Sequence, residues 1–61
     1  MGMEIVSTYV KPRHMYMMIR LANGKFAEVD CYVNRDGTKE FFTSGWKKQE
    51  LVSFFRREMM L

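Results

Sequence analysis

The stretch MIRLANGKFAEV, residues 18–29, decides how the chain folds. Its Asn23-Gly24 dipeptide lies between two segments of alternating apolar residues, which is the strongest short-range signal for a β-hairpin. The turn can have two or three residues, and the two lengths give different faces to the hairpin, because a slip of one residue moves every side chain to the opposite face. The length of this turn therefore decides which surface is buried and which is exposed.

The apolar residues of the two arms favour a three-residue turn, residues 22–24. A two-residue turn would set Ile19 opposite Glu28, an apolar side chain against a carboxylate. The three-residue turn sets Ile19 opposite Ala27 and gathers the apolar residues of both arms on one face. We therefore predict a type I turn with Gly24 in the left-handed conformation as a G1 bulge. The residues expected on the buried face are Met15, Met17, Ile19, Leu21, Ala27, Val29, Cys31 and Val33.

The same register predicts which side chains point outward. They form an amphipathic surface of aromatic rings, a thioether and charges of both signs. Glu28 and Asp30 belong to this set and are expected to form ordinary cross-strand ion pairs with Arg20, Lys25 and Lys39 as available cations. The expected outward pairs are His14–Tyr32, Tyr16–Asp30, Met18–Glu28 and Arg20–Phe26.

Further strands are expected on both sides of this hairpin. The β-branched residues of segment 4–10 predict a strand that ends before Pro12, which lacks an amide donor. The register of the last strand is left open by the sequence: a preceding loop of three residues buries Phe41, whereas a loop of two or four residues buries Phe42. The predicted strands are residues 4–10, 14–21, 26–33 and 38–43.

From about residue 46 to residue 60 the apolar spacing becomes that of a helix. Ser44 can cap its start, although Lys47 in place of a glutamate denies it a capping box, and Trp46 is expected to pack at the junction of helix and sheet. The predicted fold is a single small α+β domain, residues 1–61. It consists of an antiparallel β-meander of three or four strands with one C-terminal helix packed on one face. The apolar stripe of the helix is Leu51, Val52, Phe55 and Met59, with Phe54 on its flank.

Length and composition set limits on stability and location. A chain of 61 residues buries only about 60% of its unfolded surface, so a monomer is expected to be marginally stable. The single cysteine, Cys31, excludes an internal disulfide, and with His14 as the single histidine no Cys/His set for structural zinc exists. Oligomerisation or partner binding is the remaining aid to stability. A lone thiol is typical of a reducing compartment, so a cytoplasmic location is expected, with no membrane span and no cofactor.

Catalysis is the function that the residues favour least. Cys31 lies on the predicted buried face between Val29 and Val33, where a thiol acts as a small apolar group. His14 has no serine or cysteine nearby in the sequence that it could activate. We therefore expect that the protein is not an enzyme.

Protein binding is the function that the outward surface favours. Aromatic residues, methionine and arginine are enriched at interface cores, and monomers seldom expose a large apolar patch without using it. The hypothesis is a small interaction protein that binds a protein partner, or a second copy of itself, through the sheet face or an exposed strand edge. By analogy with phage-encoded host antagonists, it would be a modulator or inhibitor. The competing possibility is that the N-terminal strand covers this face. The expected partner-binding residues are Tyr16, Met18, Arg20, Phe26 and Tyr32.

Nucleic-acid binding through the same face is the alternative. The net charge of +3 and the isoelectric point near 9.3 permit it without requiring it. Aromatic residues on a sheet can stack on bases, and the layout resembles, in architecture alone, the three-stranded arm-binding domains of phage integrases. Glu28 and Asp30 in the middle of the face would repel phosphates and count against it. The candidate contacts are Arg13, Arg20, Lys25, Arg35 and Lys39.

Overall fold

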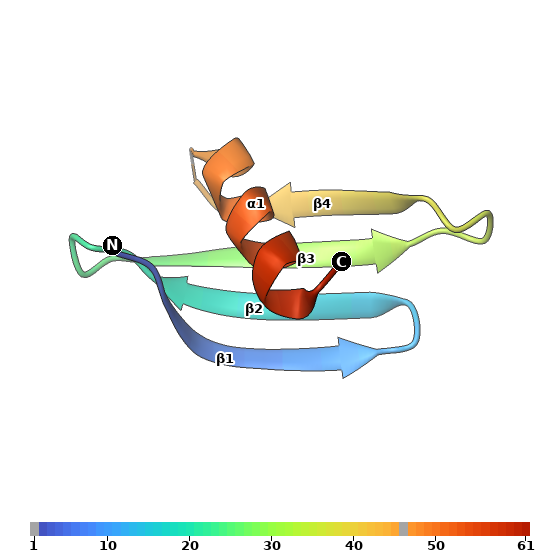
Figure 1. The fold of residues 1–61 in the computed structure, drawn as a ribbon, viewed down its shortest axis with the longest axis horizontal. Coiled ribbons are helices and arrows are strands. Elements are labelled where there is room, and N and C mark those ends of the chain that lie inside the picture. Colours follow the sequence, from blue (N-terminus) through green and yellow to red (C-terminus); the bar gives the residue numbers. More distant parts are fainter. Residues whose placement is uncertain (1, 46) are drawn as a thin grey trace.

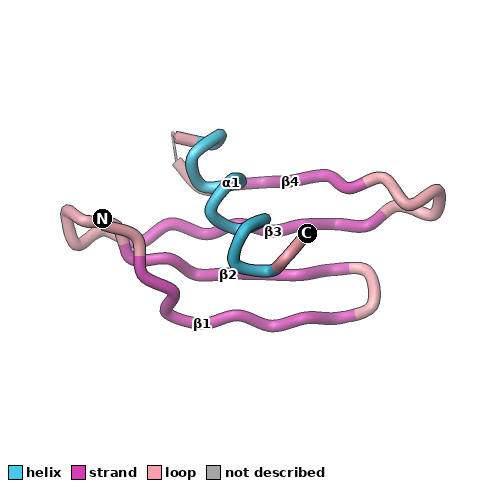
Figure 2. The backbone as a smooth tube through the Cα atoms, in the orientation of Figure 1, coloured by secondary structure: helices cyan, strands magenta, loops and turns pink. Residues whose placement is uncertain are grey.

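The computed structural model describes residues 2–45 and 47–61, and shows an antiparallel four-stranded sheet followed by one helix (Figure 1). The strands lie side by side in chain order. The helix crosses one face of the sheet (Figure 2). The predicted α+β class, a meander with a C-terminal helix, is confirmed, and the meander has four strands. The elements are β1 (Glu4–Lys11), β2 (His14–Arg20), β3 (Phe26–Val33), β4 (Lys39–Thr43) and α1 (Lys48–Met59).

The hairpin of β2 and β3 has the predicted three-residue turn. The Leu21 N–H donates to the Lys25 carbonyl at 2.8 Å, and the Gly24 N–H donates to the Leu21 carbonyl at 2.9 Å. Gly24 has a φ of 87°, the left-handed region that glycine adopts without the steric cost of a Cβ. All of the predicted outward pairs between the two strands occur. The prediction of the hairpin register is therefore confirmed.

The turn between β3 and β4 settles the register that the sequence left open. The Asn34 N–H donates to the Thr38 carbonyl at 2.8 Å, so the loop again holds three residues. Phe41 consequently faces the helix, where its ring meets that of Phe55 edge-on with 5.8 Å between centroids. Phe42 lies on the opposite face and is 53% exposed.

The core lies between α1 and the helix-facing side of β2 and β3. Cys31 is fully buried there, as predicted, and burial raises the pKa of its thiol. The helix contributes Leu51 and Phe55, while Phe54 and Met59 pack against the margin of the core. The buried side chains among the described residues are Met17, Ile19, Ala27, Val29, Cys31, Leu51 and Phe55.

The N-terminal strand extends the sheet and does not cover it. β1 pairs with β2 at one edge, with a β-bulge between Ile5 and Ser7. Its eight residues are all exposed, because α1 packs mainly on β3 and β4. On the helix side of β1, Ile5 and Val10 therefore remain uncovered. The possibility that this strand folds over the outward face is excluded by the pairing.

The start of the helix differs from the prediction. Ser44 does not cap it, because the Ser44 N–H donates to the Glu28 carbonyl at 3.1 Å and its Oγ accepts the Glu28 N–H at 2.9 Å. Ser44 therefore continues the pairing with β3. Lys47 precedes the helix in the left-handed conformation, with a φ of 59°, and the helix begins at Lys48. The prediction for Trp46 lies outside the described residues.

The helix ends in a Schellman motif with a methionine at the position where glycine is usual. Met60 has a φ of 62°, and its N–H donates to the Arg57 carbonyl at 3.3 Å. The Leu61 N–H donates to the Arg56 carbonyl at 2.9 Å, which completes the motif. The Met60 side chain is 90% exposed, so the strained backbone is not offset by buried contacts.

We expect Met60→Gly to raise the free energy of unfolding by about 1 kcal/mol, because an L-residue carries a steric cost in this conformation that glycine lacks. Urea denaturation of the two proteins measures the difference. Met59→Gly is the control: Met59 is helical and half-buried, so the same replacement there should lower stability. A Met60→Gly protein less stable than the parent would contradict the motif.

Candidate partner-binding face

The face of the sheet opposite α1, called the outer face below, consists of alternate residues from all four strands. Of the segments that the structure describes, only α1 packs on a face of the sheet, and it packs on the other side (Figure 1). The outer face is therefore open over its whole width. Its residues are Glu4, Ser7, Tyr9 and Lys11 from β1, His14, Tyr16, Met18 and Arg20 from β2, Phe26, Glu28, Asp30 and Tyr32 from β3, and Glu40 and Phe42 from β4.

Rings from all four strands form a continuous row across the outer face. Tyr9 stacks on Tyr16, with 5.2 Å between centroids, and meets His14 edge-on at 5.4 Å. His14 stacks on Tyr32 at 4.3 Å, and Tyr32 meets Phe42 edge-on at 5.7 Å. These are the offset and edge-on geometries that aromatic pairs prefer. The five side chains Tyr9, His14, Tyr16, Tyr32 and Phe42 are called the aromatic row.

Two carboxylates of β3 are hydrogen-bonded to this row. The Tyr16 hydroxyl donates to Glu28 Oε2 at 2.8 Å, and His14 Nε2 lies 2.7 Å from Asp30 Oδ1. In both cases the partner is the diagonal neighbour across β2 and β3, rather than the residue directly opposite. The carboxylates are thus held in place by side chains that belong to the row.

The predicted ion pairs of these carboxylates with nearby cations are not formed among the described residues. Arg20 pairs instead with Glu4, with 2.6 Å between Nη2 and Oε1, because β1 lies beside β2 at that end. Lys39 lies opposite Val33 and therefore on the helix side of the sheet. Lys25 belongs to the turn between β2 and β3. The prediction that Arg20, Lys25 and Lys39 neutralise the outward carboxylates is wrong.

The pKa of Tyr16 is raised to about 12 from its ordinary value of 10.0. Loss of hydration is the largest cause, followed by the hydrogen bond to Glu28 and by the negative charges of Glu28 and Asp30. All of these disfavour the phenolate. The middle of the outer face is therefore an environment that disfavours added negative charge.

This shift predicts a loss of stability at alkaline pH. Because the pKa in the folded state is above that in the unfolded state, Tyr16 contributes stability that is present below pH 10.0 and is lost as pH rises through about 12. We expect Tyr16→Phe to remove this decline, as measured by urea denaturation across that range. Glu28→Gln should move the Tyr16 titration towards its ordinary value in an NMR titration of the tyrosine rings. Glu40→Gln, on β4, is the control and should leave the raised pKa of Tyr16 unchanged.

All five predicted partner-binding residues lie on the outer face. Phe26 and Tyr32 are the most accessible of the apolar ones, 60% and 42% exposed. Tyr16 and Met18 are half-buried by their neighbours, and Arg20 is exposed but already paired. The sequence prediction missed Tyr9 as a member of this surface, because the pairing of the first strand was not predicted.

The candidate nucleic-acid contacts, in contrast, do not gather on one surface. Arg20 alone lies on the outer face, while Lys39 faces the helix side. Arg13, Lys25 and Arg35 belong to three different turns, at opposite ends of the sheet (Figure 1). A phosphate backbone following the outer face would meet few of them.

The outer face is negatively charged although the chain is positively charged. Its four carboxylates and two cations give a formal charge of −2 with His14 neutral, against +3 for the whole chain. The remaining surface therefore carries +5. The charged residues of the outer face are Glu4, Glu28, Asp30 and Glu40, with Lys11 and Arg20.

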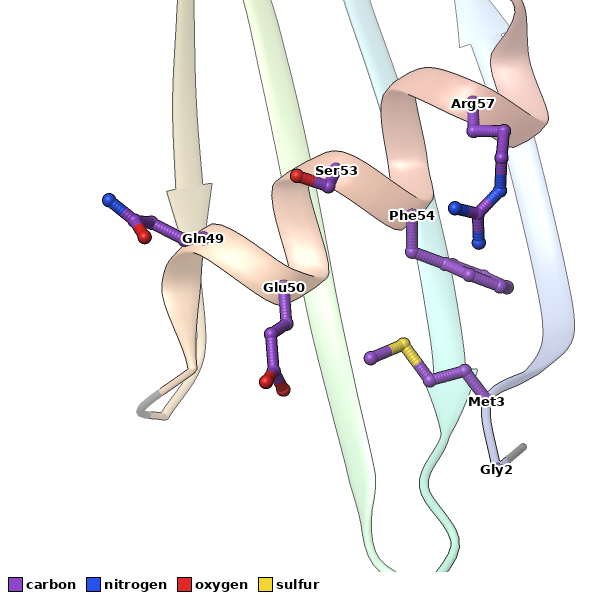
Figure 3. Close-up of a pocket in the computed structure, with 7 residues that line it drawn as sticks. All are labelled: Gly2, Met3, Gln49, Glu50, Ser53, Phe54 and Arg57. Atoms are coloured by element: carbon purple, nitrogen blue, oxygen red, sulfur yellow. The ribbon is translucent and has the colours of Figure 1, made fainter.

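A second concave surface lies beside the helix on its β1 side (Figure 3). It is an open groove of about 700 Å³ in which the side chains of Met3 and Phe54 point towards each other. Glu50 and Arg57 flank it with opposite charges, and the Arg57 guanidinium lies over the Phe54 ring at 5.6 Å. The groove arises because one helix is too narrow to cover a four-stranded sheet.

Among residues 2–45 and 47–61, no three metal-ligating side chains cluster, and no helix is long and apolar enough to cross a membrane. Compared with protein-family models, with curated proteins and with solved structures, the chain gives no significant match. The fold and the open sheet face describe the class of protein to which the chain belongs. It is a small α+β meander domain whose single helix leaves one aromatic and acidic sheet face open.

Proposed function

We propose that the chain is a small, non-enzymatic interaction protein that binds a protein partner through the outer face. The aromatic row is the observation that supports this. Tyr9, Tyr32 and Phe42 are between 42% and 53% exposed, so much of their apolar surface is covered only when another molecule binds. Rings packed against one another lose little conformational freedom on binding, which favours affinity.

The size of the face fits a protein interface. The molecule measures 37 × 19 × 17 Å, so the two longer dimensions give the face an area of about 700 Å². An interface of standard size covers about 800 Å² on each partner. A partner that binds with useful affinity would therefore cover most of the outer face, including the whole aromatic row.

A strand edge is the other surface through which a protein, or a second copy of the chain, could bind. β1 is an edge strand with eight exposed residues, and an added strand could pair with its free side. However, the bulge between Ile5 and Ser7 interrupts the regular pairing, and bulges at sheet edges oppose the addition of strands. The outer face is therefore the surface we favour.

The role we propose is that of a modulator or inhibitor in a reducing compartment such as the cytoplasm. Cys31 is a free and buried thiol, which suits such a compartment. The role rests on analogy with small phage-encoded antagonists, which act by occupying a surface of a larger protein.

Phe26→Ala and Tyr32→Ala are expected to weaken partner binding by about 30-fold each, the effect of an interface hot spot, while changing stability little. The partner is captured from a lysate of the native host with the tagged chain, and its affinity for each purified variant is then titrated. Val10→Ala, on the helix side of β1, is the control and should bind as the parent does. Unchanged binding of the outer-face variants would refute the proposal.

Nucleic-acid binding remains a second candidate because the exposed rings of Tyr32 and Phe42 could stack on bases. The charge of −2 on the outer face opposes it. Titration with labelled single-stranded and duplex oligonucleotides at two salt concentrations distinguishes nucleic-acid binding from protein binding. Binding that falls steeply with salt and is lost in Tyr32→Ala would replace the protein-binding proposal.

A further inference from the structure

We infer that the segment bound by the outer face is extended and positively charged, with arginine or lysine at alternate positions. The inference rests on the proposed function and adds the chemistry of the partner. Its first support is charge: the outer face carries −2 in a chain whose total charge is +3. A positively charged segment is attracted to this face and repelled by the rest of the surface, which would fix where it binds.

The unbalanced charge lies in the middle of the sheet. At one end Arg20 pairs with Glu4, which neutralises that corner. The hydrogen bonds to the two carboxylates of β3 come from a phenol and an imidazole, and a neutral phenol leaves the full charge on Glu28. The outer-face carboxylates that no lysine or arginine pairs with among the described residues are Glu28, Asp30 and Glu40, beside the aromatic row on β3 and β4.

The aromatic row already holds a cation. Lys11 Nζ lies 5.5 Å from the centroid of the Tyr9 ring, within the range of a cation–π interaction. Tyr32 and Phe42 present similar rings further along the row, and no cation–π contact to either is seen among the described residues. A cation from a partner could therefore bind there in the same way, next to a carboxylate.

The spacing of the carboxylates favours an extended segment. Glu28 and Asp30 are two residues apart on one face of β3, a distance of about 6.7 Å along a strand. A second extended chain lying along β3 presents alternate side chains at that same repeat. Cations at its positions i and i+2 would each face one carboxylate, whereas same-face neighbours on a helix are three or four residues apart.

The probe is a blocked peptide that alternates threonine and arginine, labelled and titrated into the intact chain at low salt with fluorescence anisotropy as the readout. A peptide with glutamate in place of arginine, and one with the arginines consecutive, are the comparison ligands. We expect the alternating arginine peptide to bind, the consecutive one to bind several-fold more weakly, and the glutamate peptide not to bind. The alternating peptide should bind more weakly as salt is added.

The double variant Glu28→Gln with Asp30→Asn should weaken this binding about tenfold. Both replacements keep an oxygen that accepts the existing hydrogen bond, so the fold is expected to persist, and circular dichroism checks it. Glu50→Gln with Glu58→Gln is the matched control, since it changes the net charge equally but on the helix. It should weaken binding less than twofold.

Equal weakening in the two double variants would show that the peptide responds to net charge alone, and would overturn the inference. Binding of the glutamate peptide, or of a single-stranded oligonucleotide in its place, would also overturn it. If a captured protein partner depends on Phe26 while the arginine peptide does not bind, the inference fails and the proposed function stands. If the partner is retained by Phe26→Ala and Tyr32→Ala, the proposed function itself fails.

Discussion

Phe55→Ala is expected to leave most of the protein unfolded at room temperature. Phe55 is fully buried and packs edge-on against Phe41 at 5.8 Å, so its ring joins the helix to the sheet. Replacement of a buried phenylalanine by alanine costs about 3–5 kcal/mol. A chain of 61 residues without a disulfide has a total stability of only about that size. Loss of the far-UV circular dichroism signal, and of dispersion in the NMR spectrum, measures the outcome.

Phe42→Ala is the matched control for this prediction. Phe42 is the same residue type, next in sequence to Phe41, but it points to the outer face and is 53% exposed. Its replacement loses one edge-on contact with Tyr32, which is worth about 1 kcal/mol, and the protein should stay folded. Similar destabilisation by the two replacements would mean that the outer face is a second core, and the binding proposal would lose its basis.

The hairpin register could be predicted because the apolar pattern of the arms outweighed the preference of Asn-Gly for a two-residue turn. The apolar residues of both arms must share a face, and the three-residue turn allows this, with Gly24 at the positive φ that its bulge position requires. The same reasoning assigned Cys31 to the core, where it is fully buried. The register of β4 stayed open because Phe41 and Phe42 are equally good candidates for burial, and only the actual turn geometry distinguishes them.

The start of the helix could not be predicted because two local preferences compete at Ser44. A serine before a helical stretch favours an N-cap, but its hydroxyl can equally accept an N–H from a neighbouring strand. In the structure Ser44 bonds to Glu28, and the strand pairing extends beyond β4. Contacts between segments distant in sequence decided this, and single-sequence spacing contains no information about them.

The sequence predicted only part of the outer face, again because contacts between distant segments decide how β1 pairs. A run of β-branched residues predicts that residues 4–10 form a strand but not which strand they pair with. The bulge between Ile5 and Ser7 then changes the alternation, so that Ile5 and Glu4 take the faces opposite to those that simple alternation from Tyr9 would give. Glu4 thereby pairs with Arg20, which was one of the three cations expected to neutralise the carboxylates of β3.

A single helix covers one side of the sheet and leaves the other side to be organised by cross-strand contacts alone. On that side, Asp30 is held by His14 and Glu28 by the Tyr16 hydroxyl, rather than by lysine or arginine, and the neutral phenol leaves the charge of Glu28 unbalanced. The combination of negative charge with exposed rings is the reason that we propose a cationic partner rather than a polyanion.

Val29→Asp is expected to abolish folding at neutral pH, whereas Asp30→Val, one residue further along β3, should leave the fold intact. Val29 is fully buried opposite Met17, and an ionised carboxylate there has no partner, which costs several kcal/mol. Asp30→Val removes one hydrogen bond, to His14, at a cost of about 1 kcal/mol, and valine suits a strand. Burial raises the pKa of a carboxyl at position 29, so part of the lost stability should return as pH falls and the neutral acid forms.

Thermal unfolding and near-UV circular dichroism at neutral and mildly acidic pH measure both variants. The folded Asp30→Val protein should also bind the alternating arginine peptide more weakly than the parent. A change at residue 29 would then affect folding, whereas a change at the adjacent residue 30 would affect peptide binding. If Val29→Asp folds as the parent does while Asp30→Val does not fold, the two faces of the sheet are assigned the wrong way round. The aromatic row would then lie beneath the helix, where no partner could reach it.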